Sequence, residues 1–220
     1  MSYLDWSISQ IATEIPGATS VLFEHNINFC SHGRKRLSEV IRQRNLDSSV
    51  ITQALSELDG SDTATIHWQA LSTPDLIERI QHKFHDCHRL QLAELQRLAE
   101  RVESVDGRNP LCPTGLAKHI AHFRLSLEQH MQKEELILFP MLANQNLEMA
   151  KGPIAVMRND HDDHLQDIEA IYELTNNISI HDDACNTWRA LYIGLKEFVH
   201  DLSVHIHVEN TVLFERERLQ

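Results

Sequence analysis

Two short segments of the sequence place a histidine four residues before a glutamate. The first pair is His130 and Glu134, and the second is His205 and Glu209. Residues at i and i+4 lie one turn apart on the same face of a helix. Each pair can therefore aim an imidazole and a carboxylate at the same point. One such pair is a common accident on a helix surface, but two copies with matching surroundings indicate a metal site built by two related helices.

Two further histidines, His85 and His161, come from two other predicted helices. If the four helices alternate in direction, all six ligand-type residues fall within a layer about 9 Å thick at the helical rise of 1.5 Å per residue. The residues alone leave alternatives open on both helices. The apolar stripe of the first helix slightly favours His88 over His85, and His164 lies one turn beyond His161. The alternative role for His88 and His164 is support at the edge of the core or of the site.

Imidazole and carboxylate ligands favour iron or manganese over a thiolate-type zinc site. A glutamate can bridge two metal ions, so Glu134 and Glu209 together predict a di-metal centre. Each metal would take two histidines, both glutamates and a solvent-derived bridge, which leaves open positions for a small diatomic ligand or water. The chain has 15 histidines in all. We expect the following to be solvated or interfacial: His82, His119, His122, His181, His200 and His207.

Composition narrows the possible partners and the compartment. The formal net charge of −12 disfavours a nucleic-acid or anionic-membrane partner. The four cysteines, Cys30, Cys87, Cys112 and Cys185, form no CxxC pair and are too sparse for a disulfide scaffold. The sequence has no signal-peptide pattern and no apolar run approaching the roughly 20 residues of a membrane span. We therefore expect a cytoplasmic protein.

Helical periodicity recurs along the chain, and no strand pattern competes with it. The sequence predicts an all-α protein with a small helical domain at 1–58, a linker at 59–73 and an antiparallel four-helix bundle at 74–220. Thr73 is the expected cap of the first long helix, with Pro74 at its first position. The four long helices are expected at about 74–103, 114–143, 153–175 and 184–217, the third starting after the break at Lys151-Gly152.

The motifs around these histidines resemble a known family. The bundle resembles hemerythrin-like domains. From about residue 5 to 215, the chain resembles the iron–sulfur cluster repair proteins, also called the repair-of-iron-centres or YtfE/ScdA-type family. The resemblance rests on these segments: Phe84-His85-Asp86, His130-Met131-Gln132-Lys133-Glu134-Glu135, Leu138-Phe139-Pro140, Val156-Met157, Asp160-His161-Asp162, His205-Ile206, Val208-Glu209-Asn210 and Leu213-Phe214. It implies a non-haem di-iron centre with four histidines and two bridging glutamates, and it favours His85 and His161 as ligands.

The resemblance also implies a function. Members of this family restore iron–sulfur clusters damaged by nitric oxide or oxidative stress. The expected acts are iron donation, nitric oxide reduction or both, so whether the chain is an enzyme stays open. The expected partners are damaged iron–sulfur proteins and small diatomic ligands, for a monomer or dimer. The alternatives are a non-catalytic di-iron sensor or store of nitric oxide or oxygen, and a purely structural helical bundle.

The N-terminal segment departs from the family pattern at one place. The family usually has adjacent cysteines followed by glycines, whereas this chain has Cys30-Ser31-His32-Gly33. A local disulfide between neighbouring cysteines is therefore impossible. His32 could lower the pKa of the Cys30 thiol or add a metal ligand. The alternative is that Cys30 is an inert, small apolar residue.

Overall fold

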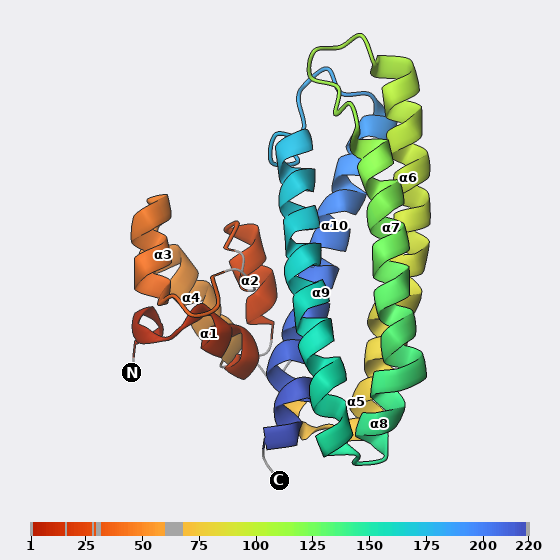
Figure 1. Ribbon diagram of the computed structural model, residues 1–220. Helices are drawn as coiled ribbons and strands as arrows, with labels where there is room; N and C mark the ends of the chain where they lie inside the picture. Colours follow the sequence, from red (N-terminus) through yellow and green to blue (C-terminus); the bar gives the residue numbers. More distant parts are fainter. Residues whose placement is uncertain (1, 16, 28, 30–31, 60–67, 219–220) are drawn as a thin grey trace. The chain divides into compact units, whose positions relative to one another are not determined.

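The computed structural model describes all residues except 1, 16, 28, 30–31, 60–67 and 219–220 (Figure 1). The described residues form helices and, apart from one isolated bridge between Ser7 and Arg36, no β-structure. The predicted all-α class with an antiparallel four-helix bundle is confirmed. The chain divides into two compact units, Met1–Leu71 with Ser203–Gln220 and Ser72–Leu202. None of the described helices is both long enough and apolar enough to cross a membrane.

The first long helix is built from three consecutive segments. These are α5 (Thr73–Ile80), a π-helical turn η3 (Gln81–His85) and α6 (Asp86–Asp106). The structure makes Ser72 the N-cap, because its hydroxyl accepts a hydrogen bond from the Asp75 amide at 3.3 Å. The prediction of Thr73 as cap was wrong by one residue, since Thr73 already begins the helix and Pro74 follows in its first turn.

The second long helix has the same composite form. It consists of α7 (Leu116–Lys133), the π-helical turn η4 (Glu134–Leu138) and α8 (Phe139–Ala143). Gly115 precedes it with φ of 96°, a left-handed conformation that glycine adopts without a steric cost.

The third long helix, α9, spans Leu147–Leu174 and begins earlier than predicted. The sequence predicts a start at Pro153, but Pro153 lies inside the helix. Proline removes one backbone hydrogen bond and disfavours a helical residue before it. The turn before it stays helical because it is rich in strong helix formers, including Leu147 and Glu148, and because Ala150 is fully buried. Packing of that turn outweighs the local effect of the proline.

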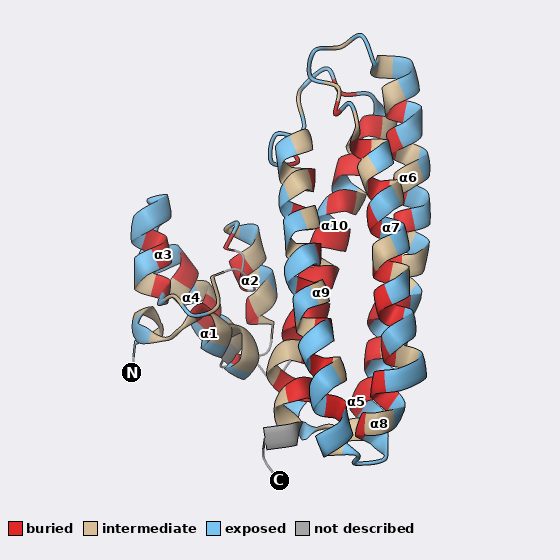
Figure 2. Ribbon diagram, viewed as in Figure 1, coloured by how far each residue is buried: buried red, intermediate tan, exposed pale blue. Residues whose placement is uncertain are grey.

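The fourth long helix is α10 (Asn186–Val208), followed by the π-helical turn η5 (Glu209–Leu213) and the 3-10 helix η6 (Phe214–Arg218). Helices α6, α7, α9 and α10 lie alongside one another (Figure 1). Their buried residues face the interior and their exposed residues face outward (Figure 2). The following large side chains of this core are almost completely buried: Phe84, Phe123, Trp188, Tyr192 and Phe198.

Among its described residues, the N-terminal segment contains four short helices. They are α1 (Ile8–Glu14), α2 (Ala18–Glu24), α3 (Leu37–Arg44) and α4 (Ser48–Asp59), with short 3-10 turns η1 (Tyr3–Asp5) and η2 (Trp68–Ala70). Ile8, Leu22, Leu37 and Ile51 are fully buried and supply its apolar core. The predictions for Cys30 and Ser31 fall outside the described residues.

Candidate metal centre

Buried histidine and glutamate side chains form two overlapping groups. Within each group, the potential ligand atoms all lie within 4.8 Å of one another. Glu134 and Glu209 belong to both groups, whereas each histidine belongs to one. The groups are His85, Glu134, His205 and Glu209, and His130, Glu134, His161 and Glu209. The structure thus brings together all six residues predicted from the sequence, each with an exposed fraction of 0–1%.

A π-helical turn occurs at three of these residues. His85 ends η3, while Glu134 and Glu209 begin η4 and η5. Each turn is closed by a backbone hydrogen bond from residue i to i−5, such as the bond from Phe139 to the Glu134 carbonyl. A π turn inserts one extra residue and rotates the next turns of the helix, which lets both the ligand-type residue and the hydrophobic residues after it face the core. Sequence periodicity contained no signal for these turns.

A hydrogen bond from Nδ1 fixes the orientation of the His85 ring. Its Nδ1 lies 2.7 Å from Glu135 Oε1, and its Nε2 lies 3.4 Å from Glu134 Oε2. Nδ1 therefore donates its hydrogen to Glu135, and Nε2 faces the shared carboxylate. Glu135 is held in turn by Arg89 at 2.9 Å, and Arg89 also binds Glu128 at 2.9 Å.

The His130 ring is oriented in the same way. Its Nδ1 lies 3.4 Å from Asp160 Oδ2, and its Nε2 lies 3.4 Å from Glu134 Oε2. The hydrogen bond from His130 and the ion pair with Lys133 at 2.8 Å hold the pKa of Asp160 well below its usual range. Asp160 is therefore ionised near neutral pH, and it draws the Nδ1 hydrogen of His130 away from the cluster.

The remaining two histidines present their Nε2 atoms to the same cluster. His161 Nε2 lies 3.2 Å from His130 Nε2, and His205 Nε2 lies 3.1 Å from Glu209 Oε1. The donor set is therefore four imidazole nitrogens and two carboxylates in a buried environment. This chemistry suits iron or manganese, and the two shared carboxylates can bridge a pair of ions.

The two alternative histidines, His88 and His164, are also buried but belong to neither group. His88 packs edge-on against Phe198, with ring centroids 5.6 Å apart, and its Nδ1 lies 3.0 Å from Gln91 Oε1. His164 packs against Phe123 at 5.6 Å and edge-on against the His130 ring at 4.9 Å. The geometry therefore groups His85 and His161, and not their neighbours, with the glutamates.

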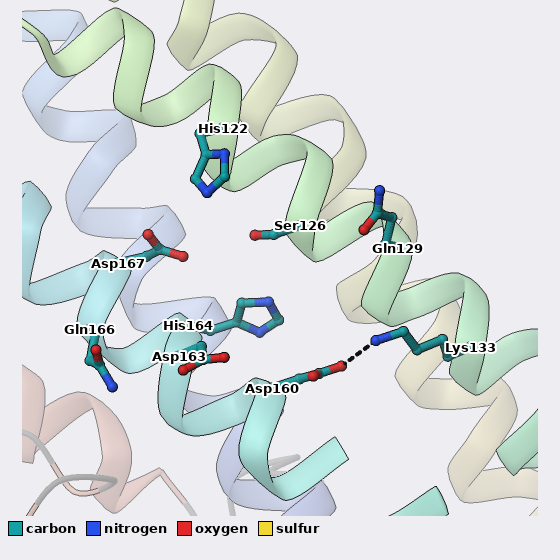
Figure 3. A pocket seen from close by; sticks show the side chains of 9 residues that line it. All are labelled: His122, Ser126, Gln129, Lys133, Asp160, Asp163, His164, Gln166 and Asp167. Carbon is teal, nitrogen blue, oxygen red and sulfur yellow. Dashed lines mark hydrogen bonds and ion pairs between the residues drawn. The ribbon is translucent and has the colours of Figure 1, made fainter. Parts of the chain in front are cut away.

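A polar cavity of about 360 Å³ opens between α7 and α9. Figure 3 shows side chains of both helices around it, with the Lys133–Asp160 ion pair at one end. Asp160 and His164 line the cavity, and both contact His130. The cavity therefore brings polar surface to the outer side of one ligand-type histidine.

The other histidines occupy varied environments. His82 is largely exposed and lies 3.2 Å from Asp86, whereas His122 lines the cavity. His181 packs against Trp188 with ring centroids 4.5 Å apart. His207 is only 5% exposed, and burial lowers its pKa to about 4. His207 is therefore neutral near pH 7.

The fold and the cluster define a class of protein, a helical bundle with a buried His/Glu cation site. In agreement, residues 77–216 match the family model described as the Hemerythrin HHE cation binding domain. Residues 4–59 match ScdA_N, a domain of unknown function. The chain is 43% identical over 216 residues to the iron-sulfur cluster repair protein YtfE of Dickeya chrysanthemi (strain Ech1591), with 98% of each chain covered.

Two further relatives carry the same name. One, from Musicola paradisiaca (strain Ech703), is 44% identical over 98% of this chain and 97% of its own. The other, from Yersinia pseudotuberculosis serotype IB (strain PB1/+), is 42% identical over 98% of both chains. The chain belongs to the iron–sulfur cluster repair family with a hemerythrin HHE cation-binding domain. The resemblance found in the sequence is confirmed.

Proposed function

We propose that this chain binds two non-haem iron ions through His85, His130, Glu134, His161, His205 and Glu209, and that it restores damaged iron–sulfur clusters. The observation that carries the proposal is the pair of ligand groups with Glu134 and Glu209 in common. Two groups that divide the histidines and share the carboxylates match two adjacent ions better than one. Both glutamates are fully buried. Burying two carboxylates is costly unless cations compensate their charge.

The surrounding residues would keep the centre ordered and shielded. Glu135 and Asp160 hold the rings of His85 and His130 with Nε2 turned inward. Phe139 stacks on the His85 ring, with centroids 5.7 Å apart. The following apolar side chains of the same helices have exposed fractions of 0–1%: Phe84, Met131 and Leu138. When bound, a diferrous pair supplies electrons and open coordination positions for a small diatomic ligand such as nitric oxide or oxygen. A solvent-derived bridge would complete it.

The names of the relatives suggest the partners. Those proteins are called iron–sulfur cluster repair proteins, so we propose that this chain acts on iron–sulfur proteins damaged by nitric oxide or oxidative stress. Iron donation and nitric oxide reduction are both compatible with a buried di-iron site. The proposed domains are a small helical domain at 1–58, a linker at 59–73 and a bundle at 74–220, a division that the two family matches support. The widely spaced cysteines fit a reducing compartment such as the cytoplasm.

Iron analysis of the full chain tests the proposal most directly. We expect anaerobically reconstituted protein to hold two irons per chain, with a Mössbauer spectrum of a coupled pair. The reconstituted protein should then reactivate aconitase whose cluster has been damaged by nitric oxide. A chain that takes up no iron would contradict the proposal and favour a structural bundle.

A second assay separates turnover from storage. The reduced protein is mixed with nitric oxide without air, and the gas phase is analysed for nitrous oxide. Nitrous oxide formation would support reduction at the centre. Uptake of nitric oxide without nitrous oxide, together with no aconitase reactivation, would favour a sensor or store.

A further inference from the structure

His207 lies between the ligand-type residues His205 and Glu209 on the same helix but faces another way. Successive residues of an α-helix are rotated by about 100°, so a residue two positions from each ligand points to nearly the opposite side. That side is nevertheless buried, because His207 is only 5% exposed. Residues of the N-terminal segment cover it, and all of these residues lie within the unit formed by Met1–Leu71 and Ser203–Gln220.

The main contact is a hydrogen bond between His207 and Thr13 of α1. Thr13 Oγ1 lies 2.9 Å from His207 Nε2 and 2.8 Å from the Ser9 carbonyl. The carbonyl can only accept, so the hydroxyl donates its hydrogen to Ser9 and accepts from His207 Nε2–H. Thr211 repeats this arrangement more weakly, since it donates to the His207 carbonyl at 2.7 Å and lies 3.5 Å from Nε2. The His207 Nε2–H is thus directed at the hydroxyl oxygens of Thr13 and Thr211. Each of these hydroxyls donates its own hydrogen to a backbone carbonyl.

Other contacts hold the same region. The edge of Phe29 packs against the His207 ring, with centroids 5.6 Å apart and planes at 85°. Phe29 is 2% exposed and immediately precedes the segment that contains Cys30. Gln69 donates to the Thr13 carbonyl at 2.7 Å. Beyond the ligand pair, Arg216 donates to the Leu71 carbonyl at 2.7 Å.

We propose that His207 is a positioning residue through which helix α1 holds the pair His205 and Glu209 in place, and that this contact limits how fast the centre releases iron. The inference rests on the proposed di-iron function. Glu209 begins a π-helical turn, where the regular α-helical hydrogen bonds are interrupted. Support from outside the helix is therefore most effective there. Groups that hydrogen-bond a metal ligand directly change metal affinity by about 10- to 100-fold. His207 acts on its neighbouring ligands through the helix backbone, so we expect an effect at the lower end of that range.

The test replaces Thr13 in the full chain. Thr13→Val removes the acceptor of the His207 bond and leaves a side chain of similar shape. Thr52→Val is the matched control, because Thr52 donates to the Ser48 carbonyl at the same 2.8 Å, one turn back, but lies on α4. At His207, His207→Leu removes the donor, whereas His207→Gln retains an N–H at the end of the side chain.

Two readouts separate the contact from the function. In the metal-free chain, we expect Thr13→Val and His207→Leu to accelerate amide hydrogen exchange in residues 205–213, with Thr52→Val unchanged. In the iron-loaded chain, we expect the same two variants to release iron to a ferrous chelator roughly tenfold faster, and His207→Gln to stay near the parent.

Unchanged exchange in metal-free Thr13→Val would overturn this inference whatever the iron content. Faster exchange with an unchanged iron-release rate would also overturn it, because the contact would then have no effect on the centre. Failure of the parent chain to take up iron is a separate result. It would remove the proposed function itself, which the iron analysis detects before any variant is compared.

Discussion

Two neighbouring layers of the bundle both bury histidines, yet they differ in what surrounds the rings. In the ligand layer, His85 and His130 each direct Nε2 toward the shared carboxylate of Glu134 at 3.4 Å. One turn further along, His88 and His164 are buried to a similar extent, with exposed fractions of 0% and 3%. Their rings pack against phenylalanines instead. Burial and helical spacing therefore do not separate the two sets of histidines, whereas a buried carboxylate in the same layer does.

The second layer is an aromatic cluster that crosses the bundle. Phe198 contacts both His88 and Phe123, with centroids 5.6 Å apart in each case, and Phe123 contacts His164. Offset and edge-on aromatic contacts of this kind stabilise a core without any charge. The ligand layer instead concentrates two carboxylates away from water, which is favourable only with a compensating cation. We therefore expect the two layers to respond very differently to substitution.

The largest effect is expected from Glu134→Leu. Glu134 belongs to both ligand groups, so its removal should abolish binding of both irons rather than one. The apolar side chain also removes a buried charge, so the metal-free fold should persist. Iron content per chain, measured after anaerobic reconstitution, checks this, with helical circular dichroism as the folding control. Full iron content in this variant would show that the carboxylate is not a bridge.

The next largest effect is a difference in iron content between variants of the two layers on the same helix. His85→Leu should lower the iron content strongly, whereas His88→Leu should leave it unchanged. The His88 variant loses the hydrogen bond to Gln91, which should cost about 1 kcal/mol of unfolding free energy. Iron analysis and urea unfolding of the metal-free chains measure both quantities. The opposite pattern, with iron lost only in His88→Leu, would make the second layer the ligand layer.

A smaller effect is expected from residues that contact the ligands from outside. Asp160→Asn keeps the size of the side chain but removes the charge that orients His130, so iron affinity should fall by about 10- to 100-fold. Chelator competition measures this change. Asp163→Asn is the control, because Asp163 lines the same cavity and stands two residues from His161. Equal loss in both variants would mean that general negative charge, and not orientation of His130, supports the site.

Much of the fold and of the candidate His/Glu cluster could be predicted because both depend on local spacing. The apolar stripes indicate four long helices, and the i, i+4 pairs place His130 with Glu134 and His205 with Glu209. The choice between His85 and His88 could not be made from periodicity, because the π-helical turn ending at His85 changes which face the next residues of the helix present to the core. The resemblance to the repair family favoured His85, and the geometry agrees.

Other features depend on contacts between distant parts of the chain. Glu135 is adjacent to a ligand-type residue in sequence, but it orients a histidine 50 residues away. The bond between Thr13 and His207 joins residues separated by 194 positions. No local pattern contains such information. Pro153 gave a misleading signal, because tertiary packing keeps the turn before it helical.

The smallest effect is expected from His164→Phe. Phenylalanine can retain the aromatic contact with Phe123, so unfolding free energy should change by less than about 1.5 kcal/mol. His161→Phe, one turn earlier on α9, is the matched variant and should lose iron, because its ring nitrogen belongs to a ligand group. Iron content and urea unfolding of both variants measure the contrast. Because both substitutions are chemically identical and both positions are buried, a difference in iron content would show that the centre needs only the ring nitrogen that lies beside the buried carboxylates.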